Sequence, residues 1–236
     1  MAVTRKQVRK VLNQKIVQLN DIIADIDSLL TTMETDYYRV SIFGSARIQP
    51  DTAPFQQVYE LAYQLAMRGV DIVTGGGPGL MQAANMGAKD GGKDSRSIGL
   101  SITLPFEADT NSHLDVKRQH RRFSSRLDEF MRISHAVVVT PGGIGTLLEL
   151  LYTWQLIQVD HIRSRPILLL GGDKMWEELL GWMRKWPLAM NLLSEKDMRH
   201  LIICESVEEV ITHIEPEIAA FRKNQSLEPT ELEELE

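Results

Sequence analysis

Residues 136–150 read AVVVTPGGIGTLLEL, an apolar run followed by a glycine-rich turn and then by apolar residues at helical spacing. The run AVVV is typical of a strand buried on both faces, because it offers no polar side chain to water. A strand, a tight turn and a helix in this order are typical of a parallel α/β sheet. A chain that only had to turn would not need three glycines here, with Thr146 among them and Glu149 on the helix that follows. The stretch therefore also raises the question of what the turn holds.

The same alternation extends outward from this stretch along the chain. Segments with helical spacing, such as 55–69 and 146–159, separate short apolar runs at 38–44, 70–76, 97–103, 135–140, 165–172 and 201–206. The sequence therefore predicts an α/β fold, a Rossmann-like doubly wound parallel sheet with helices on both faces, over residues 37–224. In such sheets ligands bind outside the carboxyl ends of the strands, which is where the glycine clusters fall.

Two extensions flank this predicted domain. Residues 1–36 are expected to form a helical extension, because apolar residues within 5–34 recur at alternating spacings of four and three: Leu12, Ile16, Leu19, Ile23, Ile26 and Leu30, widened by Ile22 and Leu29. This helix either packs on its own domain or forms a subunit contact, and both alternatives stay open. Residues 225–236 are acidic and nearly free of large core residues, which predicts a disordered tail.

Composition narrows the class of protein. The 236 residues are 43% apolar and 25% charged, as in an ordinary soluble globular protein. A single cysteine, Cys204, excludes an internal disulfide framework and favours a reducing compartment. We expect a cytoplasmic protein with no membrane span, since no apolar stretch approaches the ~20 residues needed and the N-terminus lacks a signal-peptide pattern. The net charge of −6 argues against nucleic acid polymers as partners.

Three loops carry the signals of a binding site: FGSAR (43–47), TGGGPGLMQAA (74–84) and PGGIGT (141–146). Glycine lets the backbone approach a ligand, and N–H groups at a helix start attract anions. Each loop alone could be a tight turn, but together they favour a bound phosphate. The dinucleotide and P-loop fingerprints are absent, as is the nucleophile elbow GxSxG. The six histidines have no ligand spacing, so no metal and no cofactor are predicted.

A basic stretch at 116–132 precedes the strand that ends in PGGIGT. Such a run is usually a solvated helix face. However, a helix that leads into a parallel strand begins near the carboxyl edge of the sheet, and so does the helix that follows that strand. Arg126 and Glu149 are therefore expected to face one pocket, where Arg121 and Arg122 would add positive potential.

These motifs resemble those of the LOG family, phosphoribohydrolases that release a base from a nucleoside 5′-monophosphate. PGGIGTLLE fits the family signature PGGxGTxxE, and the agreement extends through FGSAR, GGGPGLM and IGLSITLP, with Glu107, Asn111 and Arg126 at the family's spacing. The family is also labelled lysine decarboxylase, but nothing in the sequence indicates a pyridoxal site. Leu127 after Arg126 is closer to bacterial nucleotide 5′-monophosphate nucleosidases than to cytokinin-activating members, which usually have Arg-Lys.

The resemblance implies site residues and partners. The catalytic pair falls on Arg126 and Glu149, and the substrate is a nucleoside 5′-monophosphate. The phosphate would be bound by Gly142, Gly143, Gly145, Thr146, Gly76, Gly77 and Ser45. A homodimer or a higher homo-oligomer is implied as well. The preferred base stays open between adenine, another purine or pyrimidine, and a cytokinin.

The chemistry agrees with the residue types. Cleavage of an N-glycosidic bond passes through a cation-like sugar, which a carboxylate can stabilise while it activates water. Arg126 is expected to position the nucleotide or Glu149, and to lower the pKa of Glu149. The scheme does not require Mg²⁺. The alternative is a non-catalytic nucleotide or molybdenum-cofactor carrier with the same glycine loops; a DNA-processing protein shares only the fold.

Overall fold

The computed structural model describes residues 37–92, 94–103, 110–172 and 174–225, and within the N-terminal segment residues 5, 9, 11–19, 22, 23 and 26. The chain divides into two units, Met1–Asp36 and Tyr37–Glu236. In the first unit the described residues are helical. The predicted tail lies outside the described residues, except for Gln225, which ends the last helix.

The second unit alternates strands and helices. Its strands are β1 (Arg39–Phe43), β2 (Asp71–Thr74), β3 (Ser97–Ile102), β4 (Val116–His120), β5 (Ala136–Val139), β6 (Ile167–Leu170) and β7 (Leu201–Cys204). Its helices are α2 (Ala53–Met67), α3 (Leu80–Gly91), α4 (Phe123–Ile133), α5 (Ile144–Gln158), α6 (Met175–Met183), the π-helix η1 (Arg184–Leu188), α7 (Glu195–Met198) and α8 (Val207–Gln225).

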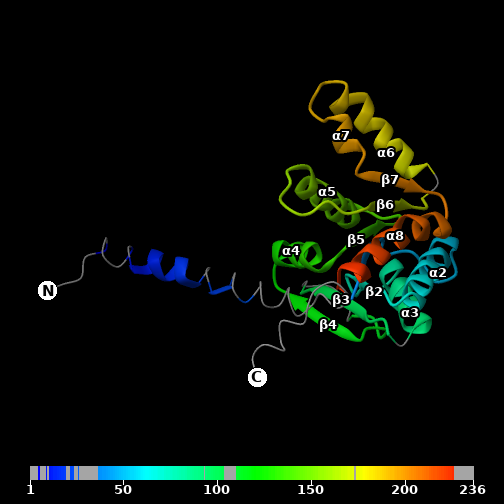
Figure 1. Cartoon of the computed structure of the whole chain (residues 1–236), viewed down its shortest axis with the longest axis horizontal. Coiled ribbons are helices and arrows are strands. Elements are labelled where there is room, and N and C mark those ends of the chain that lie inside the picture. Colours follow the sequence, from blue (N-terminus) through cyan, green and yellow to red (C-terminus); the bar gives the residue numbers. More distant parts are fainter. Residues whose placement is uncertain are drawn as a thin grey trace. The chain divides into compact units, whose positions relative to one another are not determined.

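The strands form one parallel sheet in the order β4-β3-β2-β1-β5-β6-β7, which can be followed across Figure 1. The predicted doubly wound fold is confirmed. From β1 the chain builds outward through β2 to β4, then returns to place β5 on the other side of β1. This reversal separates the loops that follow β1 and β5, and the crevice at such a point is where open α/β sheets bind ligands.

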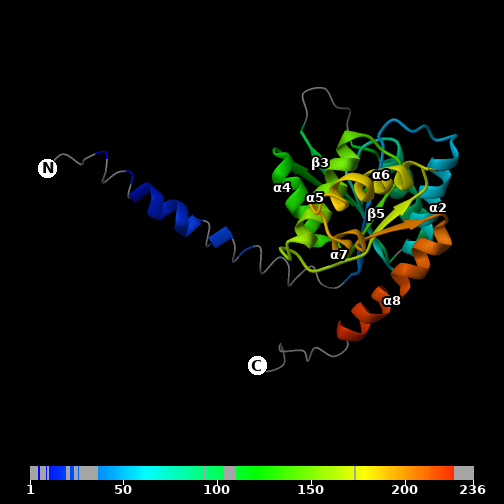
Figure 2. The same ribbon diagram turned by 90° about the horizontal axis from the view of Figure 1, so that it is seen from above.

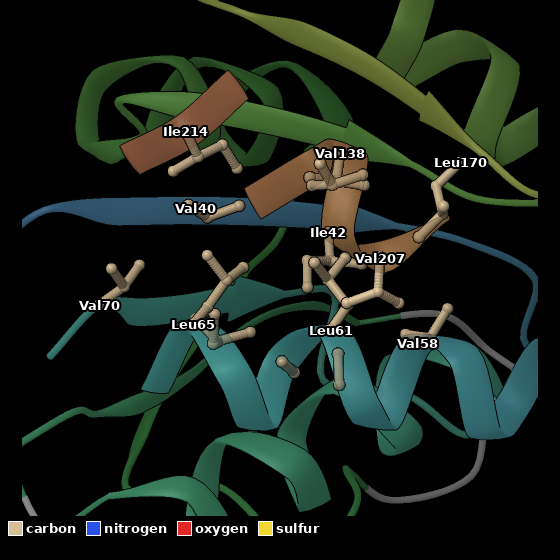
Figure 3. Close-up of a cluster of buried hydrophobic side chains, with 14 of the residues drawn as sticks. Val40, Ile42, Val58, Leu61, Leu65, Val70, Val138, Leu170, Val207 and Ile214 are labelled. Atoms are coloured by element: carbon tan, nitrogen blue, oxygen red, sulfur yellow. The ribbon is translucent and has the colours of Figure 1, made fainter. Parts of the chain in front are cut away.

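Helices cover both faces of the sheet (Figure 2). Alternate residues of each central strand point to opposite faces, so Val138 joins the core under α2, α3 and α8, and Val139 joins the core under α4, α5 and α6. Figure 3 shows the first of these cores, with Leu61 and Leu65 of α2 directed toward β1. With both faces covered, the strands read as unbroken apolar runs.

One strand differs from the sequence-based interpretation. The basic stretch predicts a helix face over residues 116–120, but these residues form β4 at the edge of the sheet, paired with β3. The reason is that β4 is only half covered: its residues alternate between partly buried and exposed, so it lacks the apolar run that identified the other strands. The helix α4 begins only at Phe123.

Candidate active site

Arg126 and Glu149 meet at the carboxyl edge of the sheet. Arg126 lies in the first turns of α4 and Glu149 in the second turn of α5, two helices that both begin at this edge. Arg126 Nη1 lies 3.2 Å from Glu149 Oε1, and the two side chains are 12% and 11% exposed. The structure therefore brings the two residues of the predicted catalytic pair into direct contact, in a place largely screened from water.

Arg126 is held by a backbone carbonyl of β3 and by an aromatic ring of its own helix. Its Nε donates a hydrogen bond of 2.7 Å to the carbonyl of Leu100 in β3, and its guanidinium lies 5.2 Å from the ring centre of Phe130. A Cβ added at Gly75 would come within 2.4 Å of Arg126 Nη2. Gly75 therefore leaves the space in which the guanidinium lies. Sequence reasoning missed this role, because it selected the two glycines that follow.

Burial decides the protonation of Glu149. Desolvation raises the pKa of Glu149 to about 7, although Arg126 acts to lower it. The sequence predicts that Arg126 lowers the pKa of Glu149, and this predicted net direction is wrong. The physical reason is that Glu149 is inside the protein, where the loss of water disfavours the carboxylate more than one neighbouring cation favours it. A carboxyl group with a pKa near neutrality suits proton transfer.

The turn after β5 contains two kinds of glycine. A Cβ at Gly142 would come within 2.1 Å of Thr146 Oγ1, so Gly142 is required by packing inside the turn. At Gly143 and Gly145 an added Cβ would meet nothing within 4 Å in the described part of the chain, and both residues are exposed. No side chain caps α5 at Gly143. The start of α5 thus presents bare backbone to the outside, which is the arrangement that binds anions at a helix N-terminus.

Ser45 joins the three predicted loops. Its N–H donates to the carbonyl of Pro141 over 3.0 Å, and its own carbonyl accepts from Leu80 N over 2.9 Å. Its hydroxyl accepts a hydrogen bond from the Arg47 N–H. Gly79 makes the crossing possible: it has a φ of +66°, and a Cβ there would come within 2.4 Å of the Ser45 carbonyl. Ser45 therefore holds the loops at one edge of the sheet.

Gly76 and Gly77 hold a neighbouring segment. The N–H of Gly76 donates to Thr74 Oγ1 over 2.9 Å, so it is already engaged, and the Gly76 carbonyl accepts from Asn111 N. The Gly77 carbonyl accepts from Asn111 Nδ2 over 2.9 Å. The same Nδ2 reaches the buried Asn85. Sequence reasoning missed Asn85, although a polar residue among the buried apolar positions of α3 is a usable signal. Glu107 lies outside the described residues.

Two further observations concern the described residues only. Among them, no group of three or more His, Cys, Asp or Glu side chains is arranged to hold a metal ion. Nor does any helix of that part of the chain have the length and apolar character needed to cross a membrane.

A family model described as "Possible lysine decarboxylase" matches residues 81–214, more than half of the chain. This is the family that the sequence motifs resemble. The chain belongs to the LOG family. The match includes both Arg126 and Glu149, together with the turn between β5 and α5.

Curated relatives of this LOG-family chain carry names of nucleotide-cleaving enzymes. A pyrimidine/purine nucleotide 5′-monophosphate nucleosidase of Escherichia coli (strain K12) is 29% identical over 176 residues, which cover 68% of this chain and 37% of that protein. The chain thus spans little more than a third of its length. A cytokinin riboside 5′-monophosphate phosphoribohydrolase of Arabidopsis thaliana is 26% identical over 188 residues, covering 78% of this chain and 85% of the relative.

Solved structures with the same fold include a molybdenum cofactor binding protein from Rippkaea orientalis. The TM-score is 0.59 at 22% identity, covering 77% of this chain and 98% of that one. At this identity the likeness concerns the fold alone, and it agrees with the observed Rossmann-like sheet.

Proposed function

We propose that this LOG-family protein hydrolyses the N-glycosidic bond of nucleoside 5′-monophosphates, releasing the free base and ribose 5-phosphate. The observation that carries the proposal is the buried Arg126–Glu149 contact of 3.2 Å, directly beside a helix start with bare backbone. The names of the relatives support the same class of reaction.

Glu149 supplies the carboxyl group that the reaction needs. As the bond between C1′ and the base breaks, positive charge develops on the ribose ring, and a carboxylate beside it stabilises that charge. Glu149 then takes a proton from the attacking water, whose oxygen bonds to C1′. The base leaves with the electron pair of the broken bond and receives the proton that Glu149 took from the water, so that Glu149 is ionised again. With its pKa raised to about 7, Glu149 can both accept and return a proton near neutral pH.

The phosphate anchors the nucleotide at the start of α5. Backbone N–H groups of Gly142, Gly143, Gly145 and Thr146 are the donors in this proposal. Open space over Gly143 and Gly145 leaves room for an anion that a side chain there would displace. Gly76 and Gly77 act indirectly in this arrangement, since their carbonyls hold Asn111 beside the site. Ser45 likewise holds the loops in place.

Arg126 keeps the carboxylate in position and available. Its bond to Leu100 and its contact with Phe130 fix the guanidinium, and the ion pair then fixes Glu149. Without Arg126 the pKa of Glu149 would rise further, because the cation is the factor that lowers it. Arg126 thus orients the carboxylate and keeps it ionised over a useful pH range.

A panel of substrates tests the proposal. The protein is incubated with AMP, GMP, CMP and isopentenyladenosine monophosphate, each compared with the nucleoside that lacks the phosphate, and free base is measured by chromatography. The matched control is Glu149→Gln, which keeps the shape of the side chain and removes its charge. We expect base release from one or more monophosphates and little from any nucleoside. Comparison of the four monophosphates also identifies the preferred base. Tight nucleotide binding without base release would instead identify a carrier.

A further inference from the structure

Phe123 is an aromatic residue on the inner face of α4 that the described part of the protein leaves uncovered. Leu127, Phe130 and Met131 follow it by four, seven and eight positions, which is the spacing of one helix face. These three side chains are buried, whereas Phe123, the first residue of α4, is 49% exposed. Among the described residues it joins neither of the two cores. The inner face of α4 therefore continues beyond its covered part with a phenyl ring.

This ring belongs to the same edge of the sheet as the catalytic pair. Arg126 follows Phe123 by three positions, so the two side chains are neighbours on one side of the helix. Side chains on a helix lean toward its N-terminus, which directs Phe123 beyond the start of α4. Arg126, one turn further in, is only 12% exposed and lies 3.2 Å from Glu149. Phe123 is therefore on the solvent side of the ion pair.

The path of the proposed substrate leads toward this ring. In the proposed function the phosphate lies at the start of α5 and C1′ lies beside Glu149. The phosphate is attached at C5′ and the base at C1′, on opposite sides of the ribose, so the base extends from Glu149 away from the start of α5. The ion pair places α4 next to Glu149. Phe123 is the one aromatic residue in the first two turns of α4.

We propose that the base of the nucleotide stacks on Phe123, and that this contact lets the site accept purine as well as pyrimidine bases. The inference rests on the proposed function and extends it to the base. Stacking on an aromatic ring tolerates different bases, because every base has a π-face. The edges of the bases, where they differ, do not take part in the stack. Purines have two fused rings and cover more of the phenyl ring, so they depend on Phe123 more than pyrimidines do.

Binding of ligands with and without a base tests the stack. Titration calorimetry measures the dissociation constants of AMP, CMP and ribose 5-phosphate for the full chain carrying Glu149→Gln, so that the nucleotides are not consumed. Adding Phe123→Ala should weaken AMP binding by about tenfold or more, the effect of losing one base–aromatic stack. CMP binding should weaken less, and binding of ribose 5-phosphate, which has no base, should stay unchanged. The matched control is Ser124→Ala at the exposed neighbouring residue, which should bind all three ligands like the parent.

Two further variants separate the ring from its apolar bulk. Phe123→Trp keeps an aromatic face and should retain AMP binding, whereas Phe123→Leu keeps an apolar side chain without a ring and should lose most of it. This pair also carries the test if Phe123→Ala does not fold.

Three outcomes would overturn the proposal: AMP affinity that is the same with and without the ring, equal losses of affinity for AMP and ribose 5-phosphate, or a parent chain that binds AMP no better than ribose 5-phosphate. The proposed reaction fails separately, because it is measured as base release by the wild-type chain. A chain that releases no base, but whose AMP affinity depends on the ring of Phe123, would contradict the reaction and support the stack.

Discussion

Arg126 Nη1 lies 3.2 Å from Glu149 Oε1. The contact joins α4 and α5, the helices that precede and follow β5 in the chain and that begin at the same edge of the sheet. This contact couples a cation held by the backbone of β3 to a carboxyl group whose pKa is raised to about 7 by burial. The first predictions follow from this coupling.

Replacing Glu149 with Gln should abolish most turnover while preserving the fold. We expect a fall in kcat of ~10² or more, because proton transfer and charge stabilisation at the ribose are both lost. Arg126→Ala should also reduce kcat. The double variant should be little worse than either single one, since residues that act as a unit are non-additive. Single-turnover base release with saturating nucleotide measures this, and a Glu149→Gln enzyme within a few-fold of wild type would contradict it.

The pH dependence of catalysis should report the same carboxyl group. Glu149 has to be ionised to accept a proton, so kcat/KM should rise with pH and level off above about 7, the raised pKa of Glu149. Arg126 lowers that pKa, so its removal should move the rising limb to higher pH. The profile is measured with the best substrate of the panel. A rise of kcat/KM centred near the usual pKa of a glutamate would show that burial does not raise the pKa of Glu149.

Stability should respond to pH in the opposite sense. The folded protein binds the Glu149 proton more tightly than the unfolded chain does, because the pKa is raised from 4.5 to about 7. The favourable contribution is therefore fully present below about pH 4.5 and is lost as the pH rises toward 7. Glu149→Gln has no such loss and should have the higher Tm at pH 7.5, where each 1 kcal/mol corresponds to ~2–4 °C. Thermal unfolding of both proteins between pH 4.5 and 7.5 checks this; parallel curves would refute it.

Alanine substitutions at Gly145 and Gly142 should have different effects: the first should weaken substrate binding and the second should destabilise the fold. Gly145→Ala adds a methyl group where nothing lies within 4 Å in the described residues, so the fold should tolerate it and could gain up to ~1 kcal/mol in helix propensity. The same methyl group should obstruct the phosphate and raise KM. Gly142→Ala would instead clash with Thr146 Oγ1 and should lower Tm. A Gly145→Ala enzyme with unchanged KM for the monophosphate would remove the start of α5 from the phosphate site.

Gly75→Ala should weaken catalysis through Arg126. The new methyl group would lie 2.4 Å from Arg126 Nη2 and 2.7 Å from Met81 Sδ, and because both atoms are at the flexible ends of their side chains, they can move away at small cost to folding. Displacement of the guanidinium by about 1 Å can cost ~10²-fold in rate. We expect kcat to fall by ~10-fold or more with little change in Tm. Unchanged kcat together with an intact Arg126–Glu149 contact in a crystal structure of the variant would rule out this positioning role.

The sequence determined the fold because local patterns carry it. Apolar runs such as AVVV cannot turn any face to water, so they had to become covered strands, and the glycine turns between them limited where helices could start. Those patterns also indicated that Arg126 and Glu149 share an edge of the sheet, since that follows from the alternation of strand and helix alone.

Tertiary structure decided what depends on neighbours distant in the chain. Whether residues 116–120 are strand or helix depended on β3, which supplies their hydrogen bonds. Which side of α5 is buried could not be read from a helix that is apolar all round, and Ile144, Leu148 and Leu151 prove to be exposed. The pKa of Glu149 depended on how completely the protein excludes water from it. Hydrogen bonding, exposure and desolvation are set by the surroundings of a residue, and these exist only after the chain has folded.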